Sequence, residues 1–273
     1  MCDEMTTSIT FPIDEVACAE SNRFADMLWA FRTVYEKLKY DNKISGCIGK
    51  IWENQKEHYE GWRKTQWESG RSTSLDDYRR EVQNTDDSLS QKIGDDEVLG
   101  PIVDALPHLR LGANEKLDLI IHGDPLGAHG EFKIRRGGEL LPLKVATDGT
   151  EEAAWECVLL NEASQQFFLG WHAGYAKHRI ISDVRKDKDI FCRNSYRSDV
   201  WSRLTDDGRA RLLKNDFGPS VKLHGDYAIV TYYTFSNFGG LFKEIVNVDL
   251  STGTVEREAE SENIIEYECG VIF

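Results

Sequence analysis

The chain has 273 residues, 40% of them hydrophobic and 11% aromatic, and this composition excludes a protein that is disordered throughout. Its 33 Lys and Arg residues against 47 Asp and Glu residues give a formal net charge of −14, which disfavours direct binding to nucleic-acid backbones or anionic membranes. Either a basic protein partner or solubility alone accounts for such a charge.

Two further features of the composition bear on location and cofactors. The sequence has no apolar run of the roughly 18 residues needed to span a bilayer, and it does not open on a basic and then apolar leader, so a cytoplasmic protein without membrane contact is expected. Its six cysteines are scattered without a CxxC pair, and we expect them to stay reduced. Neither a phosphate-binding glycine loop nor a GxSxG elbow occurs, so no cofactor is predicted.

The N-terminal part of the chain is predicted to be mainly helical. Apolar residues recur at spacings of three and four from about residue 21, and again over residues 44–69, which indicates two amphipathic helices. Ser74 followed by Asp77 fits a capping box and predicts a third helix that runs to a glycine cap at Gly94.

A fourth helix is expected over residues 95–106, kinked or restarted at Pro101 because the proline ring clashes with the preceding turn. Strands follow. Segments rich in β-branched and aromatic residues, with Gly137-Gly138 as one turn, predict strands over residues 116–122, 131–136, 139–146, 155–160 and 167–181.

The clearest structural signal lies in residues 221–259, which read as consecutive antiparallel hairpins separated by loops rich in Gly, Ser and Asn. In residues 227–235, apolar side chains occupy both the odd and the even positions, which predicts a central strand covered on both faces. Residues 242–250 alternate between apolar and polar, which predicts one solvated face, and a turn is expected at 250–253. We expect the N-terminal helices to cover this sheet.

These segments together predict an α+β protein. Residues 1–110 would form a mainly helical layer or bundle, and residues 111–273 a mainly antiparallel β-sheet region with one additional helix near 198–215.

One short motif resembles a catalytic element. The triplet His122-Gly123-Asp124, at the end of a predicted strand, resembles the catalytic-loop triplet of aminoglycoside-phosphotransferase-type kinases. The resemblance implies that Asp124 orients an acceptor hydroxyl, and it places His129 where these kinases have a magnesium-binding Asn. The same triplet recurs at residues 224–226 before a strong strand, where Gly and Asp favour a turn. A turn is therefore the simpler interpretation of both triplets, and an enzyme site at Asp124, His122 and His129 is the alternative.

Histidines are a second group of candidate ligands, in this case for a metal ion. His172 and His178 would share one face of an uninterrupted strand, and a carboxylate such as Asp124 could complete a zinc or iron site. At about 3.3 Å per residue the two histidines would lie roughly 20 Å apart, too far to share one ion. No metal is predicted.

A binding role is predicted for the loop at residues 236–240. Phe238 lies in this glycine-rich loop, where an apolar side chain needs a pocket in its own fold or in a partner. Asn237 and the nearby Tyr233 complete the predicted binding residues.

The sequence thus supports two main hypotheses. The first is a cytoplasmic protein-binding protein, in its most specific form an acidic inhibitor or immunity-type protein that neutralises a basic partner. The second is an enzyme of unrecognised family, hydrolase or phosphotransferase-like, with its site around residues 122–124. A third, a DNA-mimicking inhibitor, requires carboxylates in rows on one face.

Overall fold

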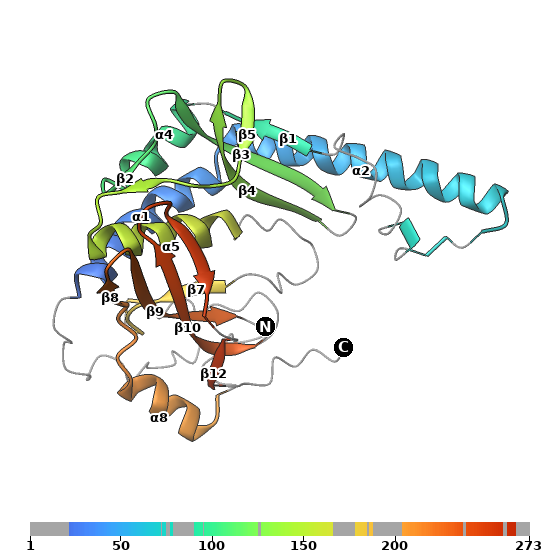
Figure 1. The fold of residues 1–273 in the computed structure, drawn as a ribbon. Coiled ribbons are helices and arrows are strands. Elements are labelled where there is room, and N and C mark those ends of the chain that lie inside the picture. Colours follow the sequence, from blue (N-terminus) through green and yellow to red (C-terminus); the bar gives the residue numbers. More distant parts are fainter. Residues whose placement is uncertain are drawn as a thin grey trace, which may run out of the picture.

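The computed structural model describes the chain at residues 22–71, 73–74, 77–78, 90–94, 96–124, 127–165, 178–184, 186–187, 204–236, 239–258 and 261–265. It shows an α+β protein in which two antiparallel sheets lie on opposite sides of one buried helix, α5 (Figure 1). The predicted fold class is therefore confirmed. Within the described ranges no helix is long and apolar enough to cross a bilayer.

The first two predicted helices are confirmed. Helix α1 (Arg23–Lys39) begins at Asn22, whose side chain accepts hydrogen bonds from two backbone N–H groups of the first turn. Helix α2 (Asn42–Glu68) begins at Asp41, whose side chain accepts one hydrogen bond, from Lys43 N. The first half of α2 packs into the core through Ile44 and Ile51, and its second half extends away from the rest of the molecule (Figure 1).

The third predicted helix is only partly correct. Its capping box exists, since the Ser74 hydroxyl accepts a hydrogen bond from Asp77 N at 3.2 Å and donates one to the Asp77 carboxylate at 2.6 Å. Residues 79–89 lie outside the described part of the chain. The prediction is wrong at its C-terminal end, because β1 (Ser90–Ile93) is a strand that pairs antiparallel with β3. Helix α4 (Asp96–Asp104) then follows with Pro101 inside it, as predicted.

Sheet 1 has the strand order β1-β3-β4-β5. Strands β3 (Glu115–Asp124) and β4 (Gly127–Arg136) confirm the strands predicted at 116–122 and 131–136, and Gly137-Gly138 turns with positive φ at both positions. The strand predicted at 139–146 is only partly correct, because β5 (Glu139–Leu141) ends at Leu141 and residues 142–145 are not in a strand. The inner face of this sheet contributes Leu117, Leu119 and Ile121 to the main hydrophobic core. The alternate residues of β3, including His122, therefore lie on the outer face. Short strands β2 (Leu109–Arg110) and β6 (Ala146–Thr147) pair separately.

The predicted strand at 155–160 is wrong, because these residues belong to helix α5 (Glu151–Gln165). Every residue from 153 to 160 is buried. Since α5 is covered on one side by sheet 1 and on the other by sheet 2, it needs no polar stripe, and its sequence lacks the amphipathic pattern of a surface helix. A short continuous apolar run does not distinguish a buried helix from a buried strand.

Sheet 2 is built mainly from the predicted hairpins. Its strands are β7 (His178–Ile181), β8 (Ser220–His224), β9 (Tyr227–Ser236), β10 (Gly240–Asp249), β11 (Thr254–Arg257) and β12 (Glu262–Ile265). Strand β9 is central, as predicted, because it pairs with β7, β8 and β10. The prediction that both its faces are covered is wrong for most of its length, because buried residues alternate with partly exposed ones from Tyr227 to Thr234. Its inner face is covered by α5 rather than by the N-terminal helices, which corrects that expectation.

Helix α8 (Asp206–Lys214) confirms part of the predicted 198–215 helix, whose first residues, 198–203, are outside the described ranges. Thr205 caps it by accepting a hydrogen bond from Gly208 N. Around α8 a second, smaller hydrophobic cluster forms from residues such as Leu212, Phe217 and Phe235. The main cluster contains residues from both 1–110 and 111–273, and the independence of these two regions as domains stays a prediction.

Candidate functional site

The structure brings the sequence-predicted catalytic residues to one end of the β3–β4 hairpin. His122 pairs in register with His129, and Asp124 pairs with Gly127 at the last step before the turn. His122 Nε2 lies 3.1 Å from Glu131 Oε1, a contact that the sequence did not predict. For Asp124 and His129 the backbone is described and the side chain is not. The predicted triplet therefore forms the last three residues of strand β3 and is not itself a turn.

Glu131 is the centre of the described contacts at this hairpin. Its second carboxylate oxygen, Oε2, lies 2.9 Å from Lys133 Nζ. Burial raises the pKa of the Glu131 carboxyl, but the hydrogen bonds from Lys133 and His122 outweigh this effect, and the pKa is lowered overall. Glu131 is therefore held as a carboxylate at neutral pH beside an imidazole.

The second triplet, at residues 224–226, is a turn. His224 ends β8, Gly225 has φ +65°, and β9 begins at Tyr227. The His224 and Tyr227 rings stack with centroids 5.4 Å apart. The same three residue types therefore form a turn here and the end of a strand at residues 122–124.

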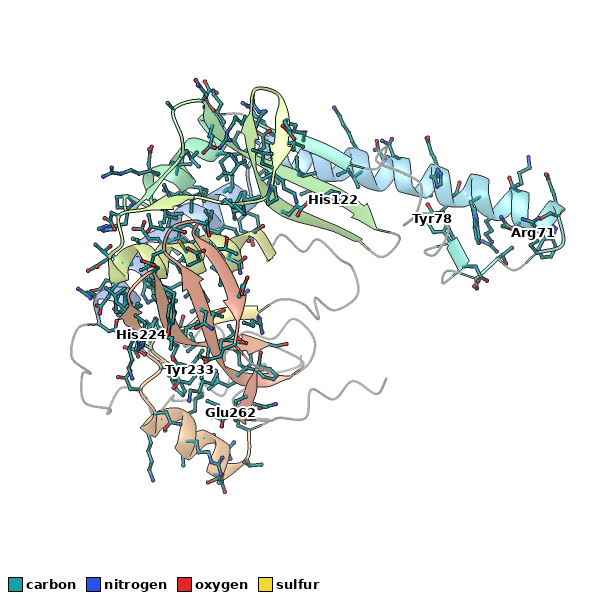
Figure 2. The ribbon with its side chains drawn as sticks, in the orientation of Figure 1. Arg71, Tyr78, His122, His224, Tyr233 and Glu262 are labelled. Carbon is teal, nitrogen blue, oxygen red and sulfur yellow. The ribbon has the colours of Figure 1, made fainter. Side chains whose placement is uncertain are left out.

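Of the predicted binding residues, only Tyr233 is described, and Asn237 and Phe238 lie outside the described ranges. Tyr233 packs edge to face on Phe217, with ring centroids 5.1 Å apart. Burial and the negative charges of Asp216 and Glu262 raise the pKa of Tyr233. Figure 2 shows Tyr233 on the same sheet as His224, with Glu262 further towards α8. Tyr233 therefore belongs to the small cluster around α8. His172 also lies outside the described ranges, and His178 begins β7 opposite Ser236.

The outer face of sheet 2 carries a group of unpaired carboxylates. Asp249, Glu256 and Glu258 are exposed, as is Asp226 in the β8–β9 turn, and among the described residues none of the four has a Lys, Arg or His within ion-pair distance. From the sequence alone, Glu256 and Glu258 suit an exposed strand edge, but nothing places them near Asp226 and Asp249. Their grouping depends on strand register, which aligns Asn247 with Glu256 and Asp249 with Tyr227.

Apolar and polar groups lie beside these carboxylates on the same face. Tyr227 is 45% exposed, and Ile229 and Ile245 are partly exposed on neighbouring strands. The Asn247 Oδ1 atom is buried and accepts no hydrogen bond within the described structure. Such an acceptor is expensive to leave unsatisfied, so it favours a donor from outside the described residues. We call Asp226, Tyr227, Asn247, Asp249, Glu256 and Glu258 the acidic face.

A second cluster of ionisable groups lies where α5 begins. His108 Nδ1 is 2.7 Å from Asp148 Oδ2, and His108 N donates a hydrogen bond to Glu156 Oε2 at 2.8 Å. The hydrogen bond to Asp148 raises the pKa of His108. Burial raises the pKa of the Glu156 carboxyl to about 7. Sequence analysis missed this cluster because its members are 40 and 48 residues apart in the chain.

Two buried ion networks have a structural role. On sheet 1 the Asp118 carboxylate is fully buried and contacts Arg135 Nε at 2.9 Å and Lys92 Nζ at 2.8 Å. On sheet 2 Arg257 Nη1 contacts Glu244 Oε2 at 2.8 Å. Each buried carboxylate is paired with a partly exposed cation, which offsets its loss of hydration.

No family model, curated protein or solved structure matches the chain. The arguments for its function therefore rest on its own residues.

Proposed function

We propose that the chain is a protein-binding protein that captures a basic partner through the acidic face of sheet 2, in its most specific form as an acidic inhibitor or immunity-type protein. The observation that carries this proposal is the set of four exposed carboxylates on sheet 2 that have no cation within ion-pair distance in the described structure, with the exposed Tyr227 next to two of them, Asp226 and Asp249. The net charge of −14 also favours a basic partner.

The electrostatics of this face favour a cationic partner. A carboxylate that is already paired contributes little to the field outside the molecule, whereas unpaired carboxylates add their fields and steer a basic protein during its approach. Most of this attraction acts within about 8 Å at physiological ionic strength, so the association rate should fall as salt is added.

The composition of the face also suits a protein contact. Tyrosine is enriched among the residues that contribute most to binding energy, and Tyr227 stands at the end of β9 between Asp226 and the register partner Asp249. The partly exposed Ile229 and Ile245 supply apolar area on the same face. A partner that presents Lys or Arg side chains would pair with the carboxylates.

The test compares two variants of the full chain that lose the same charge. The first carries Asp226→Asn, Glu256→Gln and Glu258→Gln on the acidic face. The matched control carries Glu53→Gln, Glu57→Gln and Glu60→Gln, three exposed carboxylates on α2. Asp249 is left unchanged because its carboxylate also holds the 249–252 turn through Ser251 and Thr252.

Each protein is immobilised and used to capture partners from an extract of the cells that encode it, at low and high salt. We expect the unchanged chain and the α2 control to capture the same basic protein, with an association rate that falls with salt, and the acidic-face variant to lose it. Inhibition of that partner's activity by the unchanged chain would establish the inhibitor form. Equal capture by both variants, or a partner without basic character, would refute the proposal.

A second candidate function is acid–base catalysis at His108, Asp148 and Glu156, because a carboxyl group with a pKa near 7 next to a His–Asp pair is typical of such sites. This proposal moves the enzymatic alternative away from Asp124. A panel of ester, phosphoester and glycoside substrates tests it. Activity that the unchanged chain shows and Glu156→Gln loses would support an enzyme, and equal activity in both proteins would reject this site.

A further inference from the structure

The second half of helix α2 has an exposed side that is rich in charged residues. Residues 53–68, which we call the arm, extend away from the rest of the molecule (Figure 1). One side of the arm is covered, because Tyr59 and Trp62 pack on the ring of Tyr78 with centroids 5.0 and 5.2 Å apart. At 3.6 residues per turn, the exposed residues of another side fall within about a third of the helix circumference. They form the outer stripe, which consists of Glu53, Lys56, Glu57, Glu60, Lys64, Trp67 and Glu68.

The charges of the outer stripe are not neutralised within the described part of the chain. None of its charged side chains has an oppositely charged group within ion-pair distance there. Several lie four residues apart, as Lys56 and Glu60 do, which is the spacing of the ion pairs that stabilise many exposed helices. A helix that protrudes from its fold is stabilised either by such pairs or by packing on another surface. The outer stripe is therefore available for such a surface.

Two identical arms that run in opposite directions match one another's charges. In the register that is centred on residue 62, Glu60 of each copy stands opposite Lys64 of the other. The same register places Lys56 opposite Glu68. A two-fold axis repeats each of these contacts, so every match occurs twice. The order of charges along the outer stripe is thus self-complementary.

Other arrangements of the two arms bring like charges together. A shift by about one helical turn in one direction places Glu53 opposite Glu68, and a shift in the other direction places Glu60 opposite Glu68. Parallel arms place every charge opposite its own copy. Because like charges that face each other suppress association, the charge order selects the antiparallel register centred on residue 62.

Trp67 supplies an apolar contact in this register. Its side chain is 79% exposed, and tryptophan is enriched among the residues that contribute most to binding energy. It lies opposite Glu57 and beside Lys56 of the other copy, whose long aliphatic stem can cover the indole. Just beyond the helix end, the exposed Arg71 (Figure 2) comes opposite Glu53 and adds one more pair of opposite charges.

We propose that two copies of this chain form a dimer through the outer stripes of their arms, in antiparallel orientation. Residue 53 of one copy then lies about 27 Å along the helix axis from residue 53 of the other. This distance is several times the Debye length of about 8 Å at physiological ionic strength, so the net charge of −14 on each copy opposes the contact only weakly. The interface is small and largely polar, so the dimer is weak and sensitive to salt.

Sedimentation equilibrium of the full chain over a range of protein concentrations tests the proposal. At physiological ionic strength we expect a monomer–dimer equilibrium, with a dissociation constant that rises as salt is added. Glu60→Lys brings lysines together at the central pairs, and Lys64→Glu brings glutamates together there. Each change should raise the dissociation constant by at least about tenfold.

Two further experiments restore the attraction. A chain that carries both Glu60→Lys and Lys64→Glu has opposite charges at the central pairs again and should dimerise as the unchanged chain does. An equal mixture of the two single variants should also dimerise, because each variant supplies the charge that the other lacks. Trp67→Ala should weaken the dimer without any change of charge.

Matched controls make the same charge changes elsewhere. Glu36→Lys and Lys37→Glu alter exposed residues of α1 and should leave the dissociation constant unchanged. Circular dichroism checks that each variant is folded. The interface lies on α2 and the acidic face on sheet 2, so either proposal can fail while the other stands.

Three results would overturn the dimer proposal. The first is an unchanged chain that sediments as a monomer at every concentration. The second is a dimer that both single charge reversals leave intact, because the copies would then meet through another surface. The third is a failure of both the double variant and the mixture to restore the dimer, because the central charges would then not be paired across the interface.

Discussion

The indole Nε1 of Trp155 donates a hydrogen bond to the backbone carbonyl oxygen of Phe24 at 2.9 Å, and this bond ties the buried helix α5 to the first turn of α1. Trp155 is fully buried, and its ring also packs edge to face on Tyr232 of β9, with centroids 5.9 Å apart. One side chain thus connects the N-terminal helices, the central helix and sheet 2.

Replacement of Trp155 should therefore destabilise the whole molecule. We expect Trp155→Ala to lower the free energy of unfolding by about 3–5 kcal/mol, because a large cavity opens and the Phe24 carbonyl loses its donor. Equilibrium unfolding in urea measures the change. The matched control is Trp67→Ala, since Trp67 is 79% exposed, and its effect should stay within about 0.5 kcal/mol. Similar losses in both variants would contradict the central role of Trp155.

The position of α5 explains the largest error of the sequence predictions. The surface helix α1 can be recognised because one stripe is apolar and the other polar. Helix α5 lies between two sheets and is buried on nearly every side, so its sequence has no such stripe. The apolar residues of 155–160 show neither a helical nor a strand period. In such a segment only the length of the element distinguishes a helix from a strand. The wrong prediction at β1 has a similar cause. The four residues that end at Ile93 are compatible with a helix and with a strand, and they form a strand because they pair with β3.

The candidate sites differ in how far the sequence could predict them. His122, Asp124 and His129 are close in sequence, and a hairpin between them is a local structure, so their neighbourhood was predictable. His108, Asp148 and Glu156 come together only through the packing of α5 against β2 and β6, which no local pattern encodes. The acidic face is an intermediate case, because alternation along each strand was visible but the register between strands was not.

Asp118 gives a second prediction about stability. Its fully buried carboxylate is the counter-charge of both Arg135 and Lys92 on the outer face of sheet 1. Asp118→Ala leaves two cations without a partner and should cost about 3 kcal/mol, at the low end for broken buried pairs because both cations are partly exposed and can reach water.

Urea unfolding of Asp118→Ala is compared with that of Asp96→Ala, which removes an exposed pair with Lys116 and should cost at most about 1 kcal/mol. A loss for Asp118→Ala no larger than that for Asp96→Ala would show that the buried network does not stabilise the sheet.

The predicted turn at 250–253 allows a test of close packing. Gly253 has φ +64°, and a Cβ there would lie 2.5 Å from Val145 Cγ2 and 2.8 Å from Val145 O. Gly225 has nearly the same φ, +65°, with nothing within 4 Å of its Cβ position. Gly225→Ala should therefore cost only the left-handed backbone penalty of about 1–2 kcal/mol. Gly253→Ala should cost about 1–3 kcal/mol more, because the clash with Val145 adds to that penalty. Thermal unfolding of the two variants compares them directly, and equal losses would argue against the tight contact between Gly253 and Val145.

The cluster at the start of α5 should make stability depend on pH. Burial raises the pKa of Glu156 from 4.5 to about 7, so the folded chain holds this proton more tightly than the unfolded chain. The resulting stabilisation is fully present below about pH 4.5 and is lost as the pH rises towards 7. His108, whose pKa is raised from 6.5 mainly by its hydrogen bond to Asp148, extends the loss to higher pH, because its stabilisation is complete only below 6.5.

Both groups therefore contribute a free energy of unfolding that falls as the pH rises, from about pH 4.5 to 7 for Glu156 and above pH 6.5 for His108. Urea unfolding at several pH values across this range should show two effects. Glu156→Gln removes the lower part of the pH dependence of stability, and His108→Gln removes the upper part.

Asp148 acts in the opposite direction, because burial raises the pKa of its carboxyl but hydrogen bonds from Thr150 and His108 lower it overall. Its stabilisation is lost only as the pH falls below its ordinary value of 3.8, outside this window. If the curves of Glu156→Gln and the unchanged chain run parallel from pH 5 to 7, the proton on Glu156 does not contribute to folding, and the acid–base role proposed for this residue loses its physical basis.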